Sequence, residues 1–293
     1  KSAGYIFIEP DKGVMACGTY GKGRLPEPEI IVQAVVNVLA EKKDISITDI
    51  SCNDASEINE ASDITNEQCR INPDMKGLRV LVTAGPTIEP IDPVRFITNH
   101  STGKMGYAIA SSASDRGAEV LLISGPVNIP KPDNIRVISV NTAQEMRDKV
   151  IDNYSEFDIL IFAAAVADYR CVDVLSNKMK KKDDEISIRL VKNPDIAKEI
   201  GTLKGDRIHI GFSAETENLL DNAVKKLRSK NFDMIVANDV TMEGAGFGTD
   251  TNIVKIISSD GSIRELGKMS KRDVAGEILN EALNIIKMKK GKG

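Results

Sequence analysis

The residues best suited to chemistry lie in one long loop that follows a short apolar run. Residues 80–82 are typical of a buried strand, and the loop after them carries Arg95, Asn99, His100 and Lys104. A helix-like pattern follows, and the backbone N–H groups and dipole at a helix start can bind an anion. Ordinary strand-to-helix connections have about 2–6 residues, and this one is far longer. We therefore predict a binding site in this loop.

A second group of candidates follows later strand patterns. Asp168 comes after the strand expected at 158–164. It could accept a hydrogen bond from a sugar hydroxyl or ligate a metal, or it could cap a helix or pair with the arginine two residues on. Lys226 and Lys230 lie four residues apart in the helix expected at 217–230 and so share one face. They are either surface lysines or phosphate contacts.

Two further features have open interpretations. The lysine-rich run 178–182, followed by acids at 183–185, is either a solvated turn or a mobile basic flap that closes on a triphosphate. Cys17 lies among glycines beside Lys22 and Arg24, and these cations would favour a reactive thiolate. Composition alone favours a buried small residue at this position, because cysteine is among the most buried residue types.

The sequence lacks the common catalytic and dinucleotide motifs. His100 and His209 show no metal-ligand spacing, no metal ligands can be assigned, and His209 alternates within a strand, so we expect it to be structural. G-x-S-x-G, H-E-x-x-H and Walker A motifs are absent. The G-x-G-x-x-G fingerprint is missing, and residues 124–126 (SGP) offer no ribose-binding acid. An NAD(P)-dependent reductase is therefore disfavoured, and a non-catalytic nucleotide-binding module is a further alternative.

Composition narrows the class of protein. The chain has 293 residues and 41% apolar content, enough for one or two domains. A net charge of −4, a pI of about 5.5 and 4% aromatic residues argue against a nucleic-acid partner. The chain contains neither an apolar run of about 20 residues nor a signal-peptide pattern. Its four widely spaced cysteines suit a reducing compartment, so we expect a cytoplasmic protein without a membrane partner.

From residue 77 onward, strand and helix patterns alternate. Several strand patterns are almost continuously apolar, which is typical of strands covered on both faces. We predict an α/β fold with a doubly wound, mostly parallel, Rossmann-like sheet that binds ligands at the carboxyl ends of its strands. The expected strands are 79–84, 119–124, 136–140, 158–164, 208–213, 234–237 and 253–258. The expected helices lie near 103–116, 142–154, 195–201, 217–230 and 271–288.

The first 76 residues follow a different pattern. Residues 1–42 predict a strand at 5–8, a glycine-rich loop with Gly13, Gly18, Gly21 and Gly23, and a helix from about 28 to 39. Residues 43–76 are polar and weakly periodic, which indicates a linker. Because the opening strand has no partner nearby in sequence, we expect residues 1–42 to be a remnant of a domain that lies mostly outside this chain.

Several motifs together resemble a known family. Within residues 77–293 they are TAGPTIEPIDPVRFITNHSTGKMG, AAAVADYR, KMKK, KNPDI, GFSAET and ANDV. Their order resembles that of phosphopantothenate–cysteine ligase, an enzyme of coenzyme A synthesis. ACGTYGKGRLPEP resembles the C-terminal substrate clamp of the flavoprotein phosphopantothenoylcysteine decarboxylase, which is fused to the ligase in most prokaryotes.

The second resemblance implies that residues 1–42 are the end of a flavoprotein-type decarboxylase domain. Cys17 would then be the decarboxylase thiol that donates a proton to the ene-thiolate intermediate. FMN would be bound only by the part of the decarboxylase that this chain lacks. We therefore expect the chain by itself to have no decarboxylase activity.

The ligase resemblance implies a reaction and its cofactors. The enzyme, which is unrelated to the ATP-grasp ligases, would join 4′-phosphopantothenate to L-cysteine through an acyl-cytidylate, converting CTP to CMP and pyrophosphate with Mg²⁺. Fused prokaryotic members use CTP whereas stand-alone eukaryotic ligases typically use ATP, so the fusion favours CTP. The resemblance further implies a homodimer that completes its site across the interface.

The same resemblance implies roles for individual residues. Asn99 would hold the activated acyl group, with Arg95 in the same loop, and Lys178 would supply charge. The helix start at 101–103 would suit the 4′-phosphate of the substrate. Asp168 would hold the ribose, and Phe212 would form an apolar wall beside the cytosine. The nucleotide contacts carried over are Phe162, Ala163, Ala164, Asp168, Lys178, Pro194, Asp195, Ile196, Ala197, Phe212, Lys226 and Lys230.

Overall fold

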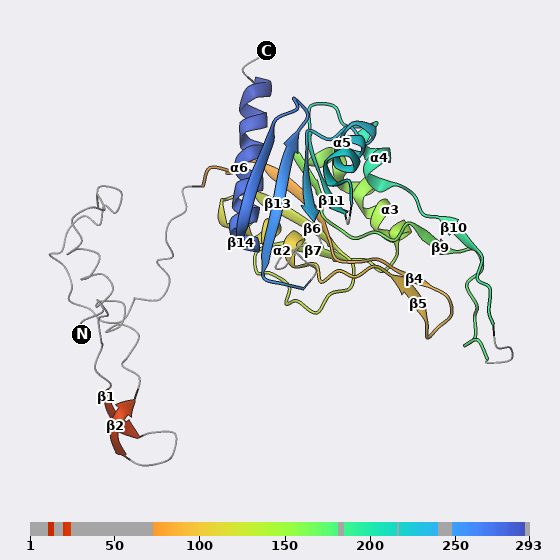
Figure 1. The fold of residues 1–293 in the computed structure, drawn as a ribbon, viewed down its shortest axis with the longest axis horizontal. Coiled ribbons are helices and arrows are strands. Elements are labelled where there is room, and N and C mark those ends of the chain that lie inside the picture. The colour runs from red at the N-terminus through yellow and green to blue at the C-terminus, as the bar shows by residue number, and fades with distance from the viewer. Residues whose placement is uncertain are drawn as a thin grey trace. The chain divides into compact units, whose positions relative to one another are not determined.

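The chain divides into two compact units, residues 1–67 and residues 68–293. The computed structural model describes residues 11–14, 20–24, 73–180, 185–215, 217–239 and 248–290. In the first unit the described part is an antiparallel pair of strands, β1 (Asp11–Val14) and β2 (Tyr20–Arg24), which Figure 1 shows in red.

This pair of strands corrects the expectation of a glycine-rich loop. Gly13, Gly21 and Gly23, expected in a loop, lie within its two strands, and Gly13 pairs with Gly21. Backbone pairing therefore prevails over the low strand propensity of glycine. The strand expected at 5–8, the helix expected at 28–39, Cys17 and most of the linker lie outside the described residues.

The second unit is built on an eight-stranded sheet in the order β14-β13-β12-β11-β8-β3-β6-β7 (Figure 1). The strands from β7 to β12 are parallel, and β13 and β14 complete one edge in antiparallel pairing. The doubly wound, mostly parallel sheet is thereby confirmed. The strands are β3 (Arg79–Ala84), β6 (Glu119–Ser124), β7 (Arg136–Ser139), β8 (Ile159–Phe162), β11 (Ile208–Glu215), β12 (Met234–Asp239), β13 (Thr251–Ser258) and β14 (Ile263–Ser270).

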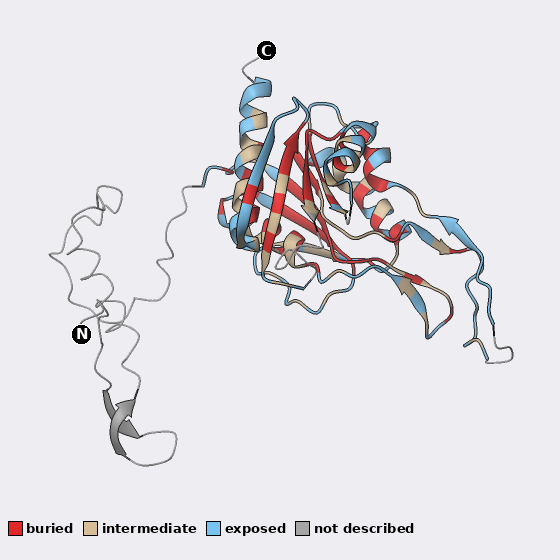
Figure 2. Ribbon diagram, viewed as in Figure 1, coloured by how far each residue is buried: buried red, intermediate tan, exposed pale blue. Residues whose placement is uncertain are grey.

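Helices cover both faces of this sheet. One face packs against α2 (Lys104–Asp115) and α6 (Lys271–Lys290). The other packs against α3 (Ala143–Asn153), α4 (Ile196–Gly201) and α5 (Leu219–Ser229), with a short 3₁₀ turn (Tyr154–Glu156) after α3. The expected helices agree with these bounds to within about two residues, the error usual for helix ends. Figure 2 shows the buried residues concentrated along the strands and the inner helix faces.

The strand order reverses next to β3. The chain runs from β3 to β6 and β7 on one side, and then returns to β8 on the other side of β3. Such a reversal leaves a crevice at the carboxyl ends of the two strands, where ligands bind in open α/β sheets. The long loop after β3 begins at this point.

Two short antiparallel pairs project beyond the sheet (Figure 1). Strands β4 (Ile88–Pro90) and β5 (Phe96–Thr98) form what we call the hairpin, residues 88–98. Strands β9 (Tyr169–Cys171) and β10 (Leu190–Lys192) form the base of what we call the arm, residues 169–192. The sequence did not predict these strands, because each has only three residues and no apolar alternation long enough to recognise.

Candidate functional site

A cavity of about 470 Å³ opens at the carboxyl ends of β3, β8 and β11. This is the position that the reversal of strand order indicates for a ligand. Its lining residues are Thr83, Met146, Phe162, Ala164, Val166, Ala167, Asp168, Tyr169, Lys192, Asn193, Pro194, Asp195, Ile196, Ala197, Phe212, Lys226, Lys230 and Phe232.

Most of the nucleotide contacts expected from the resemblance meet at this cavity. Ala163 and Lys178 are the two that do not line it. Ala163 lies between two lining residues, and its N–H donates to the carbonyl of Thr83 at 3.2 Å. Lys178 lies on the arm. The residues of the AAAVADYR and KNPDI motifs, about 25 positions apart in sequence, thus form one wall.

Aromatic rings pack against one another beneath this wall. The rings of Phe162 and Phe232 lie 5.8 Å apart, and His209 meets Phe162 edge-on at 5.9 Å. A Cβ atom on Gly211 would lie 2.1 Å from the ring of Phe232, so that strand position leaves space only for hydrogen. Phe212 lines the cavity but packs against the hydrophobic cluster on the opposite face of the sheet. Phe232 carried no sequence signal, because it lies in the turn before β12.

The buried histidine is held neutral. His209 is fully buried, and neither of its ring nitrogens has a hydrogen-bond partner among the residues that the structure describes. Burial lowers the pKa of His209 to about 4, and the nearby Lys204 charge adds to this shift. The structural role expected for His209 fits these surroundings.

Two of the three lysines that line the cavity, Lys226 and Lys230, already face carboxylates. The Nζ of Lys226 donates to Glu215 Oε1 at 2.7 Å, and the Nζ of Lys230 donates to Asp195 Oδ1 at 2.9 Å. Burial raises the pKa of Glu215, but hydrogen bonds from Lys226 and Ser213 outweigh it and hold the pKa below its usual value. Both ammonium groups are therefore pre-positioned, and an anion in the cavity would compete with these two carboxylates for them.

Asn193 ties the two loops of the wall together. Its side-chain amide donates to the carbonyl of Ala167 at 2.8 Å, and its backbone N–H donates to the carbonyl of Asp168 at 2.8 Å. Arg170 donates to Asn193 Oδ1 at 3.1 Å and to the carbonyl of Lys192, rather than pairing with Asp168. The exposed Asp168 carboxylate is thus carried on a backbone that is fixed from the opposite loop.

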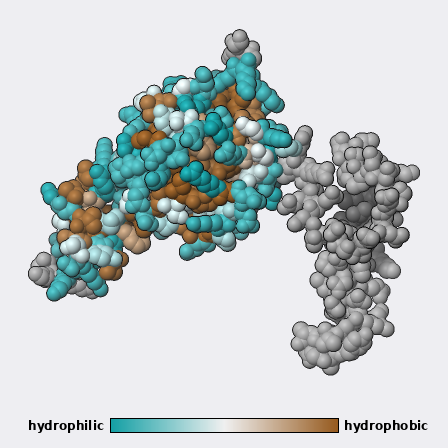
Figure 3. All heavy atoms as spheres, turned by 180° about the vertical axis from the view of Figure 1, so that it is seen from behind, coloured by the Kyte–Doolittle hydropathy of each residue, from teal (hydrophilic) through white to brown (hydrophobic). Residues whose placement is uncertain are grey.

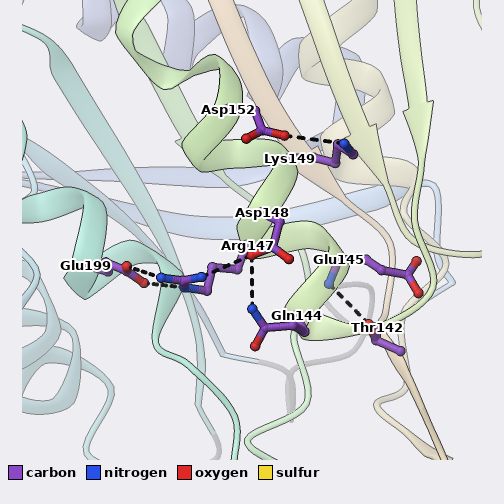
Figure 4. Close-up of polar contacts among 8 residues, drawn as sticks. All are labelled: Thr142, Gln144, Glu145, Arg147, Asp148, Lys149, Asp152 and Glu199. Atoms are coloured by element: carbon purple, nitrogen blue, oxygen red, sulfur yellow. Dashed lines mark hydrogen bonds and ion pairs between the residues drawn. The ribbon is translucent and has the colours of Figure 1, made fainter.

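An ion pair also fixes the helix below the wall. Arg147 on α3 donates from Nε and Nη2 to the two carboxylate oxygens of Glu199 on α4, at 2.7 and 2.5 Å (Figure 4). The hydrogen bond from Arg147 lowers the pKa of Glu199. Such bidentate pairs fix geometry as well as charge. The segment 194–197, which leads into α4, is therefore held relative to α3.

The long loop after β3 returns to the edge of the cavity. Asn99 Nδ2 donates to the carbonyls of Val166 at 3.0 Å and Ala165 at 3.5 Å, beside the wall. Lys104 points elsewhere: its Nζ donates to the carbonyl of Gly248 and to Asp250 at 2.7 Å. His100 is exposed. Asn99 therefore lies beside the wall, as does Thr87, whose hydroxyl oxygen accepts from the N–H of Ala167 at 3.0 Å.

Arg95 also points away from the cavity. Its guanidinium pairs with Asp92 at 2.6 Å and donates to the carbonyl of Met179 on the arm at 2.7 Å. The arm exposes apolar side chains: Val174, Ile186 and Leu190 have exposed fractions of 54%, 58% and 45%. Figure 3 shows apolar spheres on this projection. Of the KMKK run, Lys181 lies outside the described residues, so the flap expected there remains a prediction.

The fold and cavity together define a class. A doubly wound sheet with a crevice at its strand-order reversal, small residues along one wall and lysines at its edge is an arrangement in which open α/β domains bind ligands. The chain belongs to the family described as DNA/pantothenate metabolism flavoprotein C-terminal domain, whose sequence profile matches residues 75–286. The family resemblance drawn from the sequence motifs is thereby confirmed.

Individual relatives agree with this assignment. The chain is 47% identical over 279 residues to the coenzyme A biosynthesis bifunctional protein CoaBC of Bacillus subtilis (strain 168), covering 95% of this chain and 62% of that protein. It is 40% identical over 288 residues to a cysteine/cysteine sulfinic acid decarboxylase of an unknown prokaryotic organism, covering 98% and 73%. The crystal structure of the C-terminal domain of a coenzyme A biosynthesis bifunctional protein CoaBC superposes with a TM-score of 0.63 at 42% identity, covering 75% of this chain and 99% of that chain.

Two features are absent from the described residues. No helix among them is long and apolar enough to cross a membrane. No group of three or more histidine, cysteine, aspartate or glutamate side chains among them is arranged to hold a metal ion.

Proposed function

We propose that residues 77–293 form a CTP-dependent phosphopantothenate–cysteine ligase. The observation that carries the proposal is the convergence of AAAVADYR, KNPDI and the lysine pair of α5 on one cavity at the strand-order reversal. The family and the similarity to coenzyme A biosynthesis bifunctional proteins support it. The substrates would be 4′-phosphopantothenate, L-cysteine and CTP.

The first step would form an acyl-cytidylate. A carboxylate oxygen of 4′-phosphopantothenate attacks the α-phosphorus of CTP, and the bond to the bridging oxygen breaks as pyrophosphate leaves. Lys226 and Lys230 are placed to neutralise the triphosphate, exchanging their carboxylate partners for phosphate oxygens. Asp168, which lines the cavity, would hold the ribose of the nucleotide. When bound, Mg²⁺ would supply further positive charge at the triphosphate.

The second step would form the amide. The neutral amine of L-cysteine attacks the acyl carbon and an oxyanion develops on the carbonyl oxygen. The carbonyl re-forms as CMP leaves, and the nitrogen releases one proton to water. The side-chain amide of Asn99, which already faces the wall through Val166, could donate to that oxyanion. Loss of one such donor typically costs about 2.7–4 kcal/mol of transition-state stabilisation.

A second copy of the chain would complete the site. Lys178 lies on the arm and not at the cavity of its own chain. The arm exposes apolar side chains that a homodimer interface would cover. We therefore assign Lys178 to the cavity of the partner subunit, where it would add to the charge facing the triphosphate.

Pyrophosphate release tests the proposal directly. Purified protein is mixed with Mg²⁺ and 4′-phosphopantothenate, with CTP or ATP, and with or without cysteine. Release with CTP that rises when cysteine is added is the expected result. Preference for ATP would refute the assigned nucleotide, and CTP binding without pyrophosphate release would favour a non-catalytic nucleotide-binding module. A nicotinamide-dependent absorbance change would instead favour a reductase.

The role of Asn99 can be tested separately. Asn99→Asp replaces a donor with an acceptor and a negative charge, so it should slow consumption of the acyl-cytidylate more than its formation in single-turnover experiments. Asn153→Asp, at the exposed end of α3, is the matched control and should change neither rate. Equal slowing of both steps in Asn99→Asp would contradict the assigned role.

A further inference from the structure

One residue of the arm, Met179, is held at both of its backbone polar groups by the hairpin. The N–H of Met179 donates to Asp92 Oδ2 at 3.1 Å. The carbonyl of Met179 accepts from Arg95 Nη2 at 2.7 Å. Asp92 and Arg95 are themselves paired at 2.6 Å, so the two side chains form a closed clamp around one residue of the arm.

Both oxygens of the Asp92 carboxylate accept hydrogen bonds in this arrangement. Its side chain has no exposed surface. Oδ1 accepts from the backbone N–H groups of Val94 and Arg95, each at 2.8 Å, and Oδ2 also accepts from Arg95 Nε at 2.9 Å. Burial raises the pKa of Asp92, but the hydrogen bonds from Met179, Val94 and Arg95 outweigh it and hold the pKa well below its usual range. The two oxygens of this carboxylate therefore accept hydrogen bonds from four N–H groups.

A second tie lies four residues earlier on the arm. The N–H of Leu175 donates to the carbonyl of Ile91 at 3.0 Å, next to Asp92 in sequence. Residues 175–179 are thus attached to the hairpin at two points. Lys178 and Lys180 flank the clamped residue, and each is joined to it by a single peptide bond.

We propose that Asp92 is a positioning residue whose carboxylate fixes the peptide of Met179 and so sets where the ammonium groups of Lys178 and Lys180 lie. The task of those lysines, neutralising a triphosphate, rests on the proposed function. The clamp itself is a property of the hairpin and the arm and can be measured without any substrate.

The donor pattern explains why the clamp needs aspartate. All the groups that face the two carboxylate oxygens are N–H donors, so both positions must be acceptors. In Asp92→Asn, an amide oxygen turned toward Val94 and Arg95 preserves the tight turn of the hairpin. The amide nitrogen, itself a donor, then faces the N–H groups of Arg95 Nε and Met179, so these two hydrogen bonds are lost.

Hydrogen exchange at the Met179 amide is the first test. Asp92→Asn should make this amide exchange at least about tenfold faster than in the unchanged protein, because its acceptor is lost. The amides of β3 serve as the folded reference. Asp173→Asn is the matched control, since Asp173 lies on the same arm and pairs with Arg189 in an exposed position. Unchanged protection of Met179 in Asp92→Asn would overturn the proposal.

Steady-state kinetics separate positioning from a merely structural role. Asp92→Asn should raise the KM for CTP about tenfold and change kcat by less than about twofold, because the charge is displaced and the reacting groups are not.

A second variant, Met179→Pro, removes the same N–H from the side of the arm and should have the same kinetic effect. The test therefore remains possible if Asp92→Asn does not fold. Faster exchange with unchanged CTP kinetics would overturn the positioning role. Absence of activity in the unchanged protein would refute the proposed function. The exchange experiment would then still test whether Asp92 holds the Met179 amide.

Discussion

The cavity and the arm supply different parts of the proposed site, and they are ordered in different ways. The cavity is built on strands of the central sheet, and Phe232 beneath its wall is only 4% exposed. The arm leaves Ile186 58% exposed and is attached to the hairpin by backbone hydrogen bonds and the Asp92 clamp. One chain therefore forms the cavity by its own packing, whereas the described residues of the arm are held by hydrogen bonds to the hairpin and leave apolar side chains exposed.

This difference predicts where substitutions act. Changes beneath the cavity should disturb folding and binding together, because ring packing and cavity shape depend on the same residues. Changes on the arm should leave folding intact and affect only functions that need a second copy or an ordered basic segment. Three substitutions test the contrast.

The largest effect is expected from Gly211→Ala. The new Cβ would lie 2.1 Å from the ring of Phe232, which must then move against Phe162 at the base of the cavity. Overpacking of this kind typically costs about 1–3 kcal/mol, and we expect the upper end because the ring is only 4% exposed. Chemical denaturation and CTP titration measure the two consequences, and both values should fall.

Gly267→Ala is the matched control. Gly267 lies in β14, and no atom lies within 4 Å of the position that its Cβ would occupy. The unfolding free energy and the CTP affinity of the Gly267→Ala variant should stay close to those of the unchanged protein. A Gly211→Ala variant that matched this control in both measurements would show that the rings are not fixed by the core.

The sequence predicted the central strands that form the cavity better than the edge strand and the contacts of the arm. β3 and β6 were found at their observed bounds, because both are apolar and covered on both faces. β14 was missed because Leu266 is its one buried residue, and an exposed edge strand gives no apolar pattern. Asp92 was missed for another reason: its partner Met179 is 87 residues away, and a contact between distant residues leaves no local signal.

The second prediction concerns the buried histidine. In the folded state the pKa of His209 is lowered to about 4, whereas an unfolded histidine has a pKa of about 6.5. Between these values the unfolded chain binds more protons, so the stability that His209 contributes is complete above about pH 6.5 and is lost as the pH falls toward 4. From pH 7 to pH 5 the loss should be about 2 kcal/mol.

His209→Leu should remove this dependence. The variant keeps Lys204, Arg207, Asp233 and Lys289, the charged groups that influence His209, so other titrations are retained. Denaturation at pH 7 and pH 5 should show a drop in the unfolding free energy that is smaller by about 2 kcal/mol in the variant. Identical drops in both proteins would mean that the histidine is solvated or partnered in the folded state.

The smallest effect on folding is expected from Val174→Glu on the arm. The side chain is 54% exposed, and exposed substitutions usually change the unfolding free energy by no more than about 0.5 kcal/mol. The same change places a charge on the apolar surface that the proposed dimer would bury, so sedimentation should show dissociation. Ile263→Glu, on β14 and 50% exposed, is matched in chemistry and should leave both stability and assembly unchanged. If Val174→Glu lowered stability as much as Gly211→Ala, the arm would be part of the core of one chain, and the contrast between the two regions would be wrong.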